Sequence, residues 1–174
     1  MLSLQAYEQR VASLKMLHPE LPDQAVTLVR MIGFLQRRLE DALQARLADR
    51  QLTHSQWALL MLIYSDPAQC IHPSCASEVL RQSRPHMTRM TDELVARGWV
   101  ERVREDNDRR TVKIRLLPAG QAAIDSLLPV MWQRYEQLTG GIAEDEVRGL
   151  DRLLRQWLLA LESSGGEGLE GTKQ

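Results

Sequence analysis

Several features of enzymes and membrane proteins are missing from this sequence of 174 residues. No apolar run approaches the roughly 18 residues that a membrane-spanning helix needs, so we expect no membrane partner. The chain has no glycine-rich phosphate loop, no H-E-x-x-H motif and no nucleophile elbow, which argues against an enzyme and against a cofactor. The first residues do not form a basic-then-apolar leader, and this predicts a cytoplasmic protein.

Cysteine is scarce, but the two cysteines are close together in the sequence. Cys70 and Cys75 flank His72 within six residues. A tetrahedral zinc site takes such ligands, and two thiols can form a redox pair. The spacing matches none of the common zinc-binding patterns and no fourth ligand is evident, so we expect no metal site. A redox- or zinc-responsive protein that uses these three residues stays open as an alternative.

Charge is unevenly distributed along the chain, although the net charge is only −1. Residues 81–115 contain ten basic and six acidic residues, which gives this segment a net charge of +4. The rest of the chain has a net charge of −5. A basic block within an acidic chain is typical of a surface that binds a polyanion. A solvated basic face without a ligand would give the same pattern.

The basic block begins with a predicted helix over residues 83–98. Ser83 can cap its first turn, Pro85 lies where a missing N–H costs little, and Gly98 suits the left-handed residue that ends a helix. The helical period predicts a buried stripe of Met87, Met90, Thr91 and Leu94. The residues expected to contact phosphates and base edges are Ser83, Arg84, His86, Thr88 and Arg89.

A hairpin with a basic tip is predicted after this helix. Residues 99–104 and 111–117 have the alternation of short strands, and the polar residues between them favour a turn. A cationic helix followed by such a hairpin suits a winged helix, with the helix in the major groove of duplex DNA and the tip in the minor groove. The hairpin residues assigned to the DNA-binding site are Asp108, Arg109, Arg110 and Lys113.

The run TRMTDELVARGWVERVREDNDRRTVKIRL, residues 88–116, resembles the core of the MarR family of winged-helix regulators. The D-x-D-R-R wing and the L-x-x-x-G-W-V-E-R segment carry this resemblance, which extends over about residues 23–161. The strings R-G-W-V-E-R and D-N-D-R-R are most similar to the family's EmrR (MprA) branch, the repressors of multidrug-efflux operons. In the family an aspartate of the wing holds an arginine in place, and Asp108 matches this aspartate. The alternative is that Asp108 is a simple turn residue.

The rest of the chain is predicted to be helical. Residues 1–22 contain a short amphipathic arm, and helices follow at 23–49, 53–64 and 73–80. Asp23 is the expected cap of the first of these helices, and Thr53 and Gln56 form a capping box at the start of the second. A very short strand is expected at Ile71. A long helix starts at Pro118 and a last one near residue 144. We therefore divide the chain into an arm and dimerisation helix (1–49), a DNA-binding core (50–117), C-terminal dimerisation helices (118–162) and a flexible tail (163–174).

The fold class that follows is mainly α with a small β-hairpin wing: a winged helix-turn-helix with long N- and C-terminal dimerisation helices. The apolar stripes of the long helices exceed what a core of about 80 residues can bury, so we expect a homodimer. Two-fold pairing would also place the two copies of the DNA-contacting helix, residues 83–98, about one DNA turn apart, roughly 34 Å.

Aromatic residues and methionines near the junction of core and dimer helices either line an apolar pocket or form ordinary core. The resemblance implies a pocket for a small aromatic or phenolic effector between the dimer helices and the reading domain. Arg37 or Arg38 would pair with an anionic ligand there. The predicted ligand-binding residues are Met31, Phe34, Arg38, Trp57, Met61 and Trp132.

The function favoured by the sequence is a homodimeric repressor that a small aromatic or phenolic ligand, or a drug, releases from a pseudo-palindromic operator in double-stranded DNA. The resemblance also connects it with antibiotic resistance. Besides the redox- or zinc-responsive regulator, a helical protein-interaction module without a working DNA face is the other alternative.

Overall fold

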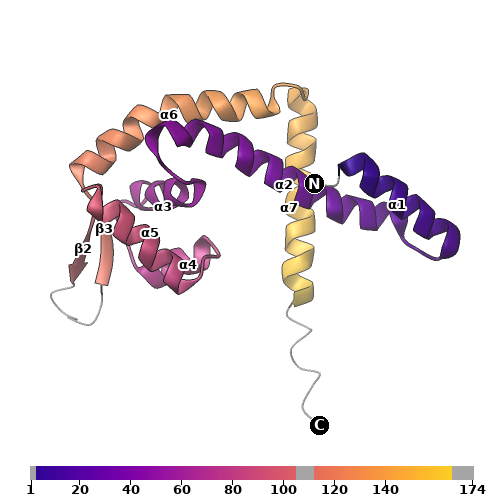
Figure 1. Ribbon diagram of the computed structural model, residues 1–174, viewed down its shortest axis with the longest axis horizontal. Coiled ribbons are helices and arrows are strands. Elements are labelled where there is room, and N and C mark those ends of the chain that lie inside the picture. The colour runs from indigo at the N-terminus through magenta and orange to yellow at the C-terminus, as the bar shows by residue number, and fades with distance from the viewer. Residues whose placement is uncertain (1–2, 105–111, 166–174) are drawn as a thin grey trace, which may run out of the picture. The chain divides into compact units, whose positions relative to one another are not determined.

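The computed structural model describes residues 3–104 and 112–165. The described chain is mainly helical and contains a three-stranded antiparallel sheet, which confirms the predicted fold class (Figure 1). The chain divides into two compact units, Met1–Met131 and Trp132–Gln174, each of which is described by itself.

The first unit contains the N-terminal helices and the winged core. Its helices are α1 (Leu4–Leu17), α2 (Asp23–Leu47), the short 3-10 helix η1 (Ala48–Arg50), α3 (His54–Tyr64), α4 (Pro73–Val79) and α5 (Arg84–Ala96). Its strands are β1 (Cys70–Ile71), β2 (Val100–Arg104) and β3 (Val112–Leu116). Each lies within a few residues of its predicted position, including the short strand at Ile71. Helix α6 (Pro118–Thr139) starts in this unit.

The cap of α2 differs from the prediction. The N-cap residue is Pro22, and Asp23 is the first helical residue. The carboxylate of Asp23 instead pairs with Lys15 on α1, with 2.9 Å between Nζ and Oδ1. This hydrogen bond lowers the pKa of Asp23. A negative charge in the first turn also interacts favourably with the helix dipole.

The start of α3 forms as predicted. Thr53 Oγ1 accepts from the backbone N–H of Gln56 at 3.1 Å, and Gln56 Oε1 accepts from that of Thr53 at 2.9 Å. The side chain of Gln44 on α2 makes two hydrogen bonds here: its Nε2 donates to the carbonyl of Leu52, and its Oε1 accepts from the backbone N–H of His54. The core of the unit has fully buried side chains that include Leu47, Leu52, Leu59, Leu60, Ile63, Leu94 and Ile114.

The sheet has the strand order β1-β3-β2. Ile114 pairs with Ile71 on one side and with Arg102 on the other, so the central strand carries the buried residue. Helix α6 leaves the sheet with Gly120 in its first turn. A Cβ built on Gly120 would lie 2.2 Å from the carbonyl oxygen of Trp99, so only glycine allows this approach.

The second unit contains the end of α6 and helix α7 (Glu144–Gly165). The predicted tail therefore starts too early, because its first three residues continue α7; the rest of it lies outside the described residues. None of the side chains between Glu144 and Ser164 is buried, although the helix has a strongly apolar face. Across both units, no described helix is long and apolar enough to cross a membrane.

Candidate nucleic-acid interface

Helix α5 has the buried and exposed faces that the sequence predicts. Ser83 is its N-cap, and Gly98 follows it with a φ of +68°. The four stripe residues, Met87, Met90, Thr91 and Leu94, are all buried. The only hydroxyl among them is satisfied, because Thr91 Oγ1 donates to the carbonyl of Met87 at 2.8 Å.

The opposite face of α5 carries the predicted reading residues. Ser83, Arg84, Thr88 and Arg89 are exposed, and His86 is half-buried. An Arg89 Nη2–H donates to His86 Nδ1 at 3.1 Å. Because Nδ1 accepts, the proton of a neutral His86 ring lies on Nε2, which is left as a donor. Arg89 Nε also lies 4.0 Å from Glu93 Oε1, so its guanidinium is held from both sides.

Thr88 uses its own proton within the helix. Its Oγ1 donates to the carbonyl of Arg84 at 3.0 Å. The hydroxyl oxygen can still accept a hydrogen bond, and the methyl group can contact a thymine methyl. Thr88 therefore suits an acceptor or apolar contact better than a donor contact.

The hairpin is attached to α5 by a residue that the sequence pattern did not single out. Arg102 on β2 donates to Asp92 Oδ1 at 2.5 Å and to the carbonyl of Thr88 at 3.4 Å. Figure 1 shows this hairpin beside α5. Arg102 therefore joins β2, the first strand of the hairpin, to α5. No local pattern in the sequence indicates this contact.

The remaining hairpin residues divide into described and undescribed ones. Lys113 is half-buried on β3, opposite Val103. Arg115 and Glu101 form a cross-strand pair, with 2.6 Å between Nη2 and Oε1. The predicted wing residues Asp108, Arg109 and Arg110 lie outside the described residues, and their role stays a prediction.

Helix α5 is also fixed on the side of α3 and η1. Gln56 donates to Glu93 at 2.6 Å. Arg97 donates to the carbonyls of Arg50 and Gln51, at 3.0 and 2.6 Å, and lies 5.3 Å from the centre of the Trp99 ring. These contacts hold the helix in one orientation, which a reading element needs.

The two cysteines of the predicted cluster differ in exposure. Cys70 is half-buried and Cys75 exposed, and both thiols are free. Within the described ranges, no three Cys, His or acidic side chains gather into a group that could hold a metal ion. No observation therefore favours the zinc-responsive alternative that the sequence left open for Cys70, His72 and Cys75.

The structure brings together three of the six predicted ligand-binding residues. Met31, Phe34 and Arg38 line a hollow of about 340 Å³ between α2 and the start of α1. Trp57 is a core residue, 3% exposed, and Met61 is half-buried elsewhere on α3. Trp132 belongs to the second unit, where it is exposed.

The chain is similar to known regulators. The sequence profile of the MarR family matches residues 52–112. The transcriptional repressor MprA of Escherichia coli K12 is 29% identical over 87% of this chain and 86% of its own length. The multiple antibiotic resistance protein MarR of the same strain is 31% identical over 80% of this chain and 96% of its own. A crystal structure of a cysteine-to-serine mutant of E. coli MarR complexed with operator DNA matches with a TM-score of 0.70 and 31% identity, over 80% of this chain and 99% of that one. These relatives regulate transcription and are not enzymes.

Proposed function

This chain belongs to the MarR family of winged-helix transcriptional regulators, and from this we infer that it binds operator DNA. In this proposal α5 enters the major groove and the hairpin tip reaches the neighbouring minor groove. The protein would do this in the cytoplasm, where an operator is accessible. A relative of 31% identity has been crystallised with its operator, which supports the proposal.

One observation carries the proposal: the helix that presents the exposed arginines is bonded to the first strand of the hairpin through Arg102. Arg84 and Arg89 are exposed on this helix, and Arg102 connects it to β2. Positive side chains supply the sequence-independent attraction to phosphates, while groups fixed in one geometry distinguish base edges. A helix without such fixed groups would bind DNA with little sequence preference.

The proposed assembly is a homodimer. On α2, Leu28 and Val29 are exposed by 46% and 62% although both are apolar, and on α7 Leu153 and Leu159 are exposed by 61% and 62%. Faces of this kind are stable in water when another surface covers them. A second copy would cover them and place two reading helices about 34 Å apart, to match a pseudo-palindromic operator.

We also propose that the protein is a repressor released by a small aromatic or phenolic compound. The names of its relatives, a transcriptional repressor and a multiple antibiotic resistance protein, support repression and a connection with drugs. A coupling of about 1–3 kcal/mol between effector and DNA would change operator affinity about 5- to 150-fold.

The test is a titration of the DNA upstream of the protein's own gene, in which fluorescence anisotropy measures the binding. We expect tighter binding than to a shuffled duplex of equal length and composition, and an affinity that falls steeply with salt. Equal binding of both duplexes would contradict sequence-specific regulation. Analytical ultracentrifugation of the same sample tests the dimer.

A further inference from the structure

Glu93 is an acidic residue on the helix that we expect to contact DNA, and it lies beside a residue expected to read a base. It follows Arg89 by one turn of α5, and the side chains of Glu93 and Arg89 are 51% and 70% exposed. A carboxylate on such a helix repels phosphates, which weakens binding to every DNA sequence. A positive role for Glu93 therefore has to come from its contacts within the protein.

The first of these contacts holds the carboxylate itself. Gln56 on α3 is buried, and its Oε1 accepts from the backbone N–H of Thr53 at 2.9 Å. This bond fixes the orientation of the amide group, because only the oxygen can accept from an N–H. The amide Nε2 then donates to Glu93 Oε2 at 2.6 Å. A side chain fixed at the start of α3 therefore holds a carboxylate on α5.

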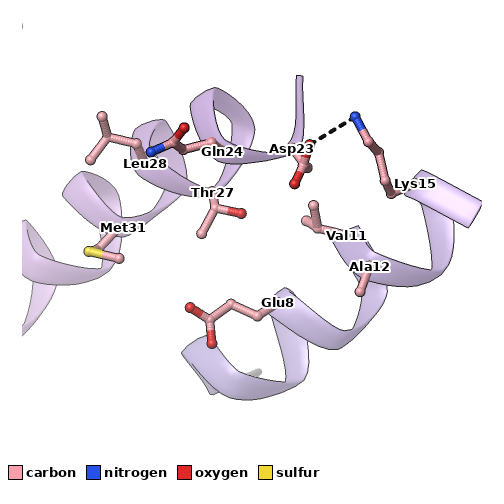
Figure 2. A pocket seen from close by; sticks show the side chains of 9 residues that line it. All are labelled: Glu8, Val11, Ala12, Lys15, Asp23, Gln24, Thr27, Leu28 and Met31. Carbon is pink, nitrogen blue, oxygen red and sulfur yellow. Dashed lines mark ion pairs between the residues drawn. The ribbon is translucent and has the colours of Figure 1, made fainter. Parts of the chain in front are cut away.

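The second contact of Glu93 is with Arg89. The other carboxylate oxygen, Oε1, lies 4.0 Å from Arg89 Nε, which is an ion pair without a direct hydrogen bond. The pair of Lys15 and Asp23 in Figure 2 differs, because 2.9 Å between Nζ and Oδ1 is a direct bond. Attraction over 4.0 Å restricts the guanidinium of Arg89 without using its N–H groups.

The third member of this group is His86. Arg89 Nη2 donates to His86 Nδ1 at 3.1 Å, which uses one of the N–H donors of the guanidinium and leaves the others. A neutral His86 then has its own N–H at Nε2. The two side chains therefore present hydrogen-bond donors, and guanine has two acceptors, N7 and O6, on its major-groove edge.

We propose that Glu93 is a positioning residue for base recognition: its carboxylate, held by Gln56, keeps Arg89 in the geometry that contacts guanine. This inference rests on the DNA-binding function proposed above. A side chain ordered before binding has less conformational freedom to lose when it meets its base. Binding to unrelated DNA through phosphates needs no such geometry and is affected only by the repulsion. Glu93 therefore makes DNA binding weaker overall but more selective.

The variant Glu93→Gln removes the charge and keeps the size of the side chain. Anisotropy titrations give the selectivity ratio, the affinity for the DNA upstream of the gene divided by that for the shuffled duplex. We expect affinity for the shuffled duplex to rise and the selectivity ratio to fall about two- to fivefold. The matched control is Glu78→Gln, which removes the same charge from an exposed position on α4 and should keep the ratio. An unchanged ratio in Glu93→Gln would overturn the proposal.

A double-mutant cycle tests whether Glu93 acts through Arg89. In the background of Arg89→Ala, the change Glu93→Gln should have no further effect on the selectivity ratio, because the side chain that Glu93 positions is gone. An equal loss in both backgrounds would contradict the proposed role.

The change Gln56→Glu tests the link between α3 and α5. Glutamate can also form a capping box, but its carboxylate would face that of Glu93 and repel it, so the selectivity ratio should fall. Combining Gln56→Glu with Glu93→Gln restores a hydrogen bond between the helices and should recover the melting temperature but not the ratio. Recovery of the ratio would show that the charge beside Arg89 is not needed, against the proposal.

The free protein provides a measurement that does not depend on DNA. The NMR order parameter of the Arg89 Nε–H group should fall in Glu93→Gln and stay the same in Glu78→Gln. An unchanged order parameter in Glu93→Gln would contradict the positioning of Arg89. Equal binding of both duplexes by the parent protein would instead contradict the proposed function, and the order parameter would still decide whether Glu93 holds Arg89.

Discussion

Arg102 and Asp92 are joined by an ion pair between the hairpin and the reading helix, with 2.5 Å between Nη1 and Oδ1. The second nitrogen of the same guanidinium bonds the carbonyl of Thr88, one turn earlier on α5. A single side chain therefore bonds β2 to two successive turns of α5, the two elements that we expect to touch DNA. Its contribution should appear in DNA binding more than in stability.

Replacing Arg102 by alanine should weaken operator binding about tenfold. The melting temperature should hardly change, because exposed ion pairs contribute only about 0–1 kcal/mol. The charge swap Arg102→Asp with Asp92→Arg should recover part of the affinity that each single change loses. Anisotropy titrations measure this, with unrelated DNA as the reference. A swap that restores nothing would show that the pair does not position the hairpin.

Replacing Arg89 by alanine should reduce discrimination at one base pair of each half-site. A bidentate contact with guanine is worth about 1–3 kcal/mol, or about 5- to 150-fold. Arg89→Lys should retain the attraction to phosphates but not the base preference. Selection of bound sequences from a random pool checks this. The expectation is wrong if the selected motif of the lysine variant equals that of the parent.

The double change Arg109→Ala/Arg110→Ala tests the predicted hairpin tip. Operator affinity should fall, and the slope of log K against log salt should become shallower by about 0.9 for each phosphate that the variant no longer neutralises. Titrations at four salt concentrations give this slope. If the chain were instead a protein-interaction module, affinity and slope would both stay the same.

Tyr64 couples α3 to α6 in a pH-dependent way. Its hydroxyl donates to Asp125 Oδ1 at 2.7 Å, and this hydrogen bond raises the pKa of Tyr64 above its ordinary value of 10.0. The stabilisation is present below the pKa of the unfolded chain and is lost as pH rises through that of the folded one. Tyr64→Phe should therefore lower stability at pH 8 and flatten its decline at alkaline pH. Urea unfolding between pH 8 and 11 measures both, and an unchanged pH profile would argue against the coupling.

Gly120→Ala should destabilise the first unit by about 1–3 kcal/mol, because its methyl group would collide with the backbone of Trp99. Gly33 provides the control, since a Cβ there meets nothing within 4 Å. Gly33→Ala, in the middle of α2, should stabilise by about 0.5–1 kcal/mol. Thermal unfolding compares the two. Similar effects at both positions would contradict the close approach at Gly120.

The sequence allows most of the winged core to be predicted, because local signals determine it. The period of Met87, Met90 and Leu94 places α5 and its faces, and the pair Thr53 and Gln56 marks the start of α3. The Arg102–Asp92 pair joins a strand to a helix, and no local pattern shows which residue of a strand lies beside a helix. Gly120 likewise depends on a backbone approach that is visible only in three dimensions.

The ligand-binding residues were the least predictable part of the molecule. Trp57 and Phe34 are both large and apolar, and the sequence alone does not distinguish a side chain that fills the core from one that lines a hollow. Trp57 is in the core because it lies on the buried part of α3, together with Leu60 and Ile63. Phe34 lines the hollow because α1 folds back along α2, a contact between helices that no local motif indicates.

Helix α2 is long enough for a small tilt to produce a large displacement at its end. Its 25 residues extend over about 37 Å, with the hollow beside Arg37 and Arg38 in its middle and the core residue Leu47 at its end. A tilt of about 5° about one end moves the other by about 3 Å, close to the rise of one base pair, 3.4 Å. In the proposed dimer, a reorientation of this size would be enough to move a subunit by one base-pair step relative to its half-site.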